Sequence, residues 1–420
     1  MKLCWLIPSV RGGGVAAVSL SCCRQAARAG HETTLLMLLS PTGWMDTSHD
    51  FRVSSLELSG AAQEAPETLL QWLEENPQDV VFLNGCEQAE AVIPYLYPSI
   101  KCVYVVHDTA PRYWRTAIIQ EDNLDAIVAV SETVASSFRH RLKQRAKLCV
   151  VLNGCIFPKQ PDTKLESLLQ TLEGERGREG EGGKELCLVR QDELLFLGGD
   201  NPYKGAFDLL KLWKQLVKLG FPGKLHWFGN VAPQFRARLD QLPDCERIHV
   251  YGHVNRDLIF RAAASAKVLL VLTRAESFGL ATIEAMSMGC VPVAWDIDTG
   301  TKEIVKSDKT GLFAPLGNTQ VLARLVLYAC NNYQAFGAAV IEHARANFDE
   351  AVMWKGYESL INHISTLQPI ERSKKGQQPT AYKHPLRRFQ LLPLSIRSGI
   401  REFVGRSPRL GYWLRDLRGF

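Results

Sequence analysis

Two carboxylates, Glu276 and Glu284, have seven residues between them at a predicted strand-loop-helix junction. The apolar run Val268–Thr273 predicts a buried parallel strand, and Leu280–Met288 predicts a helix that ends at Gly289. Free backbone N–H groups at such a helix start favour a phosphate, and carboxylates accept hydrogen bonds from vicinal sugar hydroxyls. The pattern indicates a ligand with a phosphate between two hydroxyl-bearing rings, as in a nucleotide sugar. If the spacing is considered alone, a solvated helix residue at 284 and a helix-start acid at 276 are favoured instead.

A glycine-rich loop, 8–14, follows the first predicted strand and contains Gly12, Gly13 and Gly14. Glycines allow positive φ and bring backbone N–H groups close to a ligand. The loop lacks G-x-G-x-x-G spacing, and no acidic residue ends the second predicted strand, so NAD binding is disfavoured. Considered alone, the loop is equally consistent with a tight turn that binds nothing.

A second glycine-rich loop begins with Gly198 and Gly199 and ends at Lys204 and Gly205. Lys204 lies beside a predicted helix start, and a lysine combined with a helix dipole is a sensible partner for a pyrophosphate. The alternative is an ordinary solvated lysine.

His107 follows the apolar run 103–106, at the carboxyl end of a predicted central strand. Parallel α/β sheets bind ligands at that edge, so His107 could donate to a substrate oxygen. A purely structural hydrogen bond made by His107 is an equally favoured interpretation. Ser131-Glu132 predicts a helix cap and Asn153-Gly154 a turn that closes the first domain.

Both halves of the chain alternate predicted strands and helices, which is typical of an α/β protein with parallel sheets. Strands are predicted at Leu3–Ile7, Thr33–Leu39, Val80–Asn84, Cys102–His107, Ala126–Val130 and Cys149–Leu152, and then at Leu194–Leu197, Lys224–Phe228, Ile248–Tyr251, Val268–Thr273 and Val291–Ala294. Helices are predicted at Val15–Ala29, Pro66–Glu75, Glu132–Lys143, Ala206–Leu219, Arg256–Ala264, Leu280–Met288, Gln320–Asn331, Tyr333–Ala346 and Asp349–Ile364. A Gly- and charge-rich stretch without apolar residues, 174–185, predicts a mobile linker between the halves.

The composition is that of a globular protein, with 46% hydrophobic residues, and no apolar run is long enough to span a membrane. The first residues predict a strand and not a secretion signal, so we expect a cytoplasmic protein. Eleven cysteines without a C-x-x-C pair predict reduced thiols, with neither a zinc site nor a disulfide framework.

The net charge of +5 comes from the end of the chain, because residues 371–420 carry twelve Lys/Arg against three Asp/Glu. Apolar residues recur there at helical spacing beside arginines, among them Ile400, Phe403, Trp413 and Leu417. A basic amphipathic segment binds anionic membranes, so residues 385–420 predict peripheral contact at the inner face of the membrane. The alternatives are packing on the first domain or disorder. A nucleic-acid partner is disfavoured because no recognisable binding module accompanies the charge.

The order of the motifs resembles that of the retaining family-4 glycosyltransferases, which have the GT-B fold. In chain order the motifs are the glycines at 12–14, His107, Ser131-Glu132, Asn153-Gly154, Lys204-Gly205, Gly252, Glu276-Ser277-Phe278-Gly279, Glu284-Ala285-Met286, Gly289 with Pro292-Val293, and Glu303. The resemblance implies two Rossmann-like doubly wound domains facing across a cleft. We expect an acceptor domain at 1–157, a flexible linker at 158–193, a donor domain at 194–348, a crossover helix at 349–368 and a basic tail at 369–420.

The resemblance also implies a reaction, in which a hexosyl-type sugar moves from a nucleotide-sugar donor to a glycan, lipid or other hydroxyl acceptor with retention of configuration. Glu276 would hold the donor sugar, Glu284 the ribose and Lys204 the diphosphate. His107 would contact the sugar from the other side of the cleft, so the expected catalytic residues are His107, Glu276 and Lys204. The expected donor site comprises Gly12, Gly13, Gly14, Gly198, Gly199, Lys204, Gly252, His253, Val254, Arg274, Glu276, Ser277, Phe278, Gly279, Leu280 and Glu284.

No cofactor or metal is expected, since a lysine and helix N-termini can stabilise a leaving diphosphate. Asp296-Ile297-Asp298 has the letters of a metal-binding Asp-x-Asp motif but follows a strand assigned to the donor side.

One position departs from the family, whose members usually carry Gly-Arg where this chain has Gly198-Gly199. A missing charge-assisted contact to the diphosphate costs about 1.5–3 kcal/mol, and Arg274 or Arg11 could substitute. This departure motivates one alternative to the transferase, a catalytically silent relative that binds a nucleotide sugar or glycan. A sugar-nucleotide 2-epimerase of the same fold is the other alternative.

Overall fold

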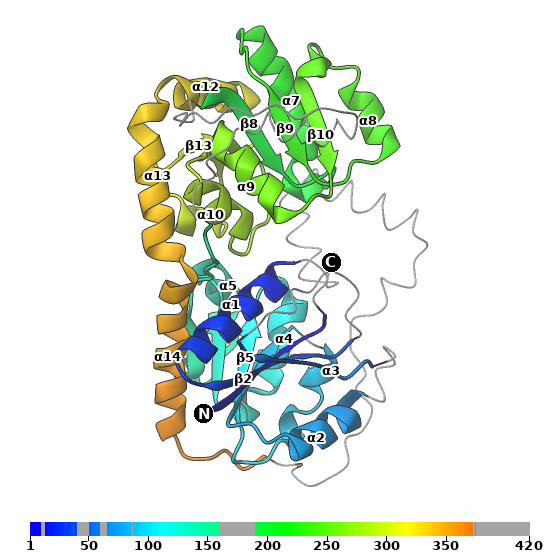
Figure 1. Cartoon of the computed structure of the whole chain (residues 1–420), viewed down its shortest axis with the longest axis vertical. Helices are drawn as coiled ribbons and strands as arrows, with labels where there is room; N and C mark the ends of the chain where they lie inside the picture. Colours follow the sequence, from blue (N-terminus) through cyan, green and yellow to red (C-terminus); the bar gives the residue numbers. More distant parts are fainter. Residues whose placement is uncertain are drawn as a thin grey trace, which may run out of the picture. The chain divides into compact units, whose positions relative to one another are not determined.

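The computed structural model describes residues 1–9, 13–39, 50–58, 65–85, 87–158, 190–372 and 374. The chain forms two compact units, Met1–Ile156 with Phe348–Phe420, and Phe157–Asn347 (Figure 1). Each unit has its own parallel sheet, which confirms the predicted α/β class with two Rossmann-like domains. Arg11, Gly12, the linker over 159–189 and the predicted membrane segment 385–420 lie outside the described residues.

The sheet of the first unit has the strand order β3-β2-β1-β4-β5-β6-β7. Its strands are β1 (Lys2–Ile7), β2 (Glu32–Met37), β3 (Arg52–Ser55), β4 (Val80–Asn84), β5 (Lys101–Val106), β6 (Ala126–Ala129) and β7 (Leu148–Val150). β4, β5 and β6 are buried along their full length. Such continuous burial is expected of parallel strands that are covered on both faces.

The helices of the first unit are α1 (Gly14–Arg28), α2 (Ala65–Glu75), α3 (Glu87–Glu90), α4 (Pro111–Ile119), α5 (Glu132–Phe138) and α14 (Glu350–Thr366). Although α14 comes near the end of the described chain, it covers the central strands. Trp5 stacks on Phe82 at 4.3 Å between ring centroids, and Tyr357 of α14 meets Phe82 edge-on at 5.8 Å. Aromatic contacts between β1, β4 and α14 therefore form part of this core.

A buried carboxylate fixes the start of α14 against α1. Glu350 accepts hydrogen bonds from Arg24 at 2.9 Å and from Gln25 at 2.8 Å. These contacts hold the pKa of Glu350 below its usual value, although its burial alone would raise it.

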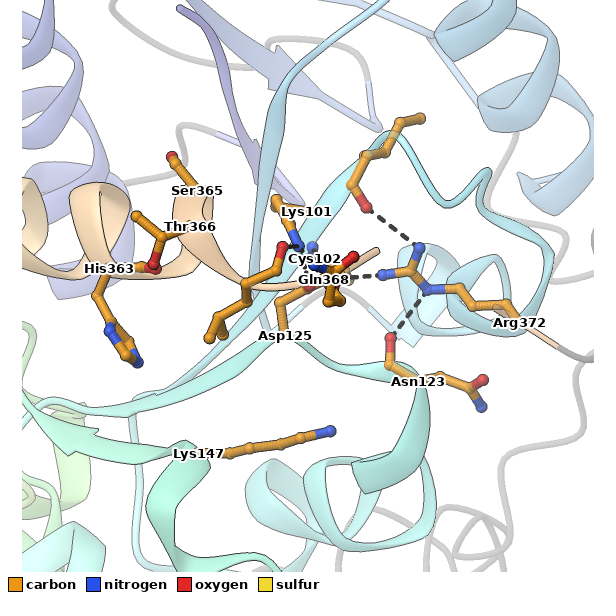
Figure 2. A network of polar contacts seen from close by, with 12 residues as sticks. Lys101, Cys102, Asn123, Asp125, Lys147, His363, Ser365, Thr366, Gln368 and Arg372 are labelled. Atoms are coloured by element: carbon orange, nitrogen blue, oxygen red, sulfur yellow. Dashed lines mark hydrogen bonds and ion pairs between the residues drawn. The ribbon is translucent and has the colours of Figure 1, made fainter. Parts of the chain in front are cut away.

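The segment after α14 is fastened to the opposite end of the sheet from His107, where β5 and β6 begin (Figure 2). Arg372 lies 2.9 Å from the Asp125 carboxylate and donates to the carbonyl oxygens of Asn123, Tyr97 and Ile100. Lys101 pairs with the same carboxylate at 3.1 Å. The start of the basic tail, at least to Arg372, is therefore part of the first unit.

The sheet of the second unit has the order β10-β9-β8-β11-β12-β13. Its strands are β8 (Gln191–Leu197), β9 (Leu225–Phe228), β10 (Ile248–Gly252), β11 (Ala266–Val271), β12 (Val291–Asp296) and β13 (Leu312–Pro315). Its helices are α7 (Ala206–Lys218), α8 (Pro233–Leu239), α9 (Arg256–Ser265), α10 (Leu280–Ser287), α11 (Thr301–Ile304), α12 (Thr319–Asn331) and α13 (Tyr333–Phe348).

Several elements differ from the prediction. β3, β13, α4, α8 and the one-turn helices α3 and α11 were not expected, because they are short or carry half-polar sequence at the edges of the sheets. The helix predicted over Glu132–Lys143 ends at Phe138 and continues as a 3-10 turn, Arg139–Arg141. Arg139 reaches back to Glu132, so its side chain is used in a local ion pair.

Candidate functional site

The expected donor loop joins β11 to α10 at the carboxyl end of the second sheet. Gly279 caps α10 with a φ of 110°, a left-handed conformation that glycine adopts without strain. The first hydrogen bonds of α10 run from the N–H groups of Thr282 and Ile283 to the Gly279 carbonyl, so the N–H groups of Leu280 and Ala281 ahead of them can serve an anion. Ser277 and Phe278 precede this cap, and Phe278 is buried.

Gly300, which follows β12, supports this loop from the side. Its N–H donates to the Glu276 carbonyl at 2.9 Å, and a Cβ added to it would lie 2.5 Å from the Cα of Phe278. Only a glycine lets the two loops approach this closely. Sequence reasoning did not single out Gly300, although its position after a buried strand was a usable signal.

Lys204 and Glu276 form an ion pair, with 2.6 Å between Nζ and Oε2. The side chains are 39% and 21% exposed, so a solute can reach both. The structure thus brings together two residues that the sequence places in the donor site, 72 positions apart. A bound diphosphate would compete with Glu276 for the ammonium group.

The turn that carries Lys204 is fixed to the end of β11. Gly205 has a φ of 85°, and a Cβ there would lie 2.2 Å from the Leu272 carbonyl oxygen. The backbone N–H of Arg274 donates to the Tyr203 carbonyl at 2.7 Å. The Arg274 guanidinium pairs with Asp208 of α7 at 2.7 Å, and both side chains are nearly buried. Arg274 thus ties the β11 loop to the helix that follows the lysine.

Glu284 lies in the middle of α10, and its neighbours Ile283, Ala285 and Met286 are buried. Its side chain is 15% exposed and accepts a hydrogen bond from Arg256 at 2.5 Å. Burial raises the pKa of the Glu284 carboxyl, and the guanidinium of Arg256 counteracts that rise. Sequence reasoning missed Arg256.

Gly198 and Gly199 lie against the loop that follows β9. Gly199 has a φ of 57°, and a Cβ on it would lie 2.6 Å from the Asn230 carbonyl oxygen. A Cβ on Gly198 would meet the Lys204 side chain at 2.8 Å. The β8 loop therefore has no room for the arginine that the family usually carries at this position.

The end of β10 closes the same edge of the sheet. Gly252 accepts a hydrogen bond from the N–H of Gly229 at 2.7 Å. His253 is exposed, and Val254 packs on the apolar cluster around Phe260 and Leu269. These three residues lead directly into α9 and Arg256.

In the first unit, His107 follows β5 and its Nε2 lies 3.0 Å from the Asn84 Oδ1. The Asn84 amide nitrogen donates to the carbonyl oxygens of Leu6 and Phe82, so its oxygen accepts a hydrogen bond from the His107 Nε2–H. Burial lowers the pKa of His107 to about 4. His107 is therefore a neutral imidazole with its proton on Nε2. Asn84 is the last residue of β4 and His107 directly follows β5, so both lie at the carboxyl ends of neighbouring strands. Their positions after two predicted strands were a signal for this contact in the sequence.

Of the first glycine loop, Gly13 and Gly14 are described and Gly12 is not. Gly13 is the N-cap of α1 and Gly14 its first residue. Ser131 caps α5 by accepting a hydrogen bond from the Val134 N–H at 3.1 Å, as its position predicts.

Asp296 and Asp298 are both paired with Lys302, at 2.8 and 3.1 Å. Over the described parts of the chain, no group of three or more His, Cys, Asp or Glu side chains is arranged to hold a metal ion. No helix in those parts is long and apolar enough to cross a membrane.

Two doubly wound parallel sheets are the GT-B architecture, which this chain shares with solved glycosyltransferase structures. The chain belongs to the family-4 glycosyltransferases: residues 12–155 match the family "Glycosyltransferase Family 4" and residues 185–347 match "Glycosyl transferases group 1". A comparison with curated proteins gives no match.

Solved structures share the fold at low sequence identity. HepE from Anabaena, in complex with UDP and glucose, has 16% identity and a TM-score of 0.66 over 86% of this chain and 100% of its own. Sucrose-phosphate synthase from Thermosynechococcus elongatus has 15% identity and a TM-score of 0.65 over 87% of this chain and 99% of its own. WaaB, a lipopolysaccharide outer core galactosyltransferase, has 15% identity and a TM-score of 0.61 over 86% of this chain and 99% of its own.

Proposed function

We propose that this protein is a retaining, metal-independent glycosyltransferase that moves a hexosyl residue from a nucleotide-sugar donor to a hydroxyl acceptor. The observation that carries the proposal is the Lys204–Glu276 pair at 2.6 Å beside the N-terminus of α10. A cation, free helix N–H groups and a carboxylate at one strand-end edge match the charge pattern of a sugar diphosphate.

In the proposed reaction, the bond between the anomeric carbon and the diphosphate breaks, and a bond from the acceptor oxygen forms on the same face. The acceptor proton passes to the departing diphosphate. Lys204 and the N–H groups of α10 stabilise the negative charge that develops on the leaving group. Glu276 holds sugar hydroxyls, and His107 remains the proposed catalytic residue of the first unit.

The acceptor is proposed to be a glycan, a lipid or another hydroxyl compound. The solved relatives include a lipopolysaccharide galactosyltransferase and a sucrose-phosphate synthase, which together support a hydroxyl acceptor without narrowing it. Peripheral membrane contact through residues 385–420 is part of the proposal. Co-sedimentation with anionic liposomes tests it, with the full chain compared to a chain shortened to 1–374, which keeps the Arg372 anchor. Equal sedimentation of the two chains would contradict membrane contact.

A second candidate function is nucleotide-sugar binding without turnover. Gly199 favours it, because the arginine of relatives is missing and a Cβ at this position would lie 2.6 Å from the Asn230 carbonyl oxygen. In this case donor binding would survive while transfer would be lost.

The decisive experiment begins with a thermal-shift screen against UDP-, GDP- and ADP-sugars. The stabilising donor is then incubated with and without candidate acceptors, and nucleoside diphosphate release is measured. Release that requires an acceptor supports the transferase, and an α-configured product from an α-donor supports retention. A new sugar nucleotide formed without acceptor would identify a 2-epimerase. Binding of the donor without turnover would identify the catalytically silent relative. Glu276→Gln keeps the side chain's shape and removes its charge, so it serves as the control variant that should lose acceptor-dependent release.

A further inference from the structure

We propose that Arg256 is the positioning residue of Glu284: its guanidinium holds one carboxylate oxygen and leaves the other to accept hydrogen bonds from the ribose hydroxyls of the donor. This inference rests on the proposed function, because it assigns the partner of a carboxylate that the proposal places on the ribose.

Arg256 contacts one of the two carboxylate oxygens of Glu284. The Nη2 of Arg256 lies 2.5 Å from Oε1 of Glu284, which leaves Oε2 with no hydrogen bond from any described residue. An ionised carboxylate is acceptor-only, so a second oxygen can take up to two hydroxyl hydrogens. Vicinal hydroxyls of a ribose supply that pair of donors.

The Glu284 carboxylate lies in largely apolar surroundings. Glu284 is 15% exposed on a helix whose adjacent residues are buried and apolar, so its charge needs a partner within the protein. α9 packs on α10, and Arg256 at its start supplies that partner. The guanidinium also lies over the Phe260 ring, at 5.1 Å from its centroid, which restricts its orientation.

Arg256 occupies an unusual position for a cation in its own helix, α9. It is the first residue of α9, whose N-cap is Asn255. A cation there faces the positive end of the helix dipole, which is electrostatically unfavourable. The stability of α9 therefore does not explain an arginine at this position, whereas orientation of Glu284 does. Local rules that a sequence breaks in this way are expected at functional sites.

The test measures how strongly the protein distinguishes a nucleotide from its 2′-deoxy form. UDP, GDP and ADP are first titrated calorimetrically into the wild-type protein, and the nucleotide that binds is compared with its 2′-deoxy analogue. We expect the wild type to bind the ribose form about tenfold more tightly, and Arg256→Met to bring the ratio close to one. Arg256→Lys, which restores a charge, is expected to recover part of the ratio.

The matched control is Arg236→Met, which breaks an exposed Arg–Asp pair on α8 of the same unit and should leave the ratio unchanged. If Arg256→Met does not fold, Arg256→Gln replaces it, with a reduced ratio again expected. A wild-type ratio retained in Arg256→Met or Arg256→Gln would overturn the role of Arg256 while donor binding stands. Absence of binding to all three nucleotides by the wild type would instead overturn the proposed function, and with it the inference.

Discussion

Arg372 and Asp125 form an ion pair that is closed to solvent, with side chains 0% and 1% exposed and 2.9 Å between Nη2 and Oδ2. Every nitrogen of the guanidinium is used, since the remaining two donate to backbone carbonyls of the first unit. The pair joins residues 247 positions apart and secures the chain after α14.

Arg372→Met is expected to destabilise the first unit by about 3–5 kcal/mol, because the buried Asp125 carboxylate loses the guanidinium and keeps Lys101 and the Cys102 N–H. Calorimetric unfolding measures the change. The exposed pair Arg236–Asp240 is the control, where Arg236→Met should cost less than about 1 kcal/mol. Equal losses in the two variants would show that the buried pair adds no stability. Likewise, a chain ending at 371 should unfold at a lower temperature than one ending at 374, because it lacks Arg372.

Lys204→Ala is expected to reduce the transfer rate by about a hundredfold, because the leaving diphosphate loses a preorganised cation. Steady-state assays with the identified donor measure kcat and KM separately. Glu276→Gln should also lose activity, but it frees Lys204 from its partner at 2.6 Å, so nucleoside diphosphate alone should bind no more weakly than to wild type. Unchanged turnover in Lys204→Ala would remove the lysine from the mechanism.

Arg274→Met and Asp208→Asn are expected to have similar effects on donor affinity. The two side chains form one nearly buried pair, so either change releases the loop from α7 and removes that ion pair from the other group. A double-mutant cycle on the dissociation constant should show strong coupling. If Arg274 instead binds the diphosphate, as its assignment to the donor site implies, Arg274→Met alone would weaken binding and Asp208→Asn would not.

Stability should fall with acidification as His107 becomes protonated in the unfolded chain. Its pKa drops from 6.5 to about 4 on folding, so between these values the unfolded state binds more protons. The stabilisation is complete above about pH 6.5 and disappears towards pH 4, a loss of roughly 3 kcal/mol. Urea unfolding of wild type and His107→Gln between pH 4 and 7 measures it, and parallel pH curves for the two proteins would exclude His107 as the source.

Gly199→Arg, which recreates the Gly-Arg pair of relatives, is not expected to strengthen donor binding. The backbone at this position has a φ of 57°, and its Cβ would lie 2.6 Å from the Asn230 carbonyl. Conformational strain and the clash should lower the melting temperature. Gly317→Arg is the control, because its φ is also positive, at 82°, but nothing lies within 4 Å of its Cβ. Tighter donor binding by Gly199→Arg, measured by calorimetry, would contradict this account.

Most of both sheets could be predicted from the sequence, because parallel strands such as Val80–Asn84 and Val291–Asp296 are continuous apolar runs. The half-polar edge strand Arg52–Ser55 carries no such signal, since its pairing with β2 is a tertiary property.

The same limit applies to the site. The spacing of Glu276 and Glu284 could be recognised in one continuous loop-helix segment. The cationic side chains that pair with these two carboxylates could not be assigned from the sequence. Lys204 and Arg256 lie 72 and 28 positions away from these carboxylates, so the pairs exist only once the sheet has brought the strand ends together.

The placement of α14 has a consequence for how the protein is made. A ribosome completes residues 350–366 only after the whole second sheet has been synthesised, yet Trp354 and Tyr357 pack against Trp5 and Phe82 of the first strands. The nascent first unit therefore emerges with this aromatic surface bare and finishes folding last. During translation that surface stays uncovered for as long as the intervening unit takes to be made.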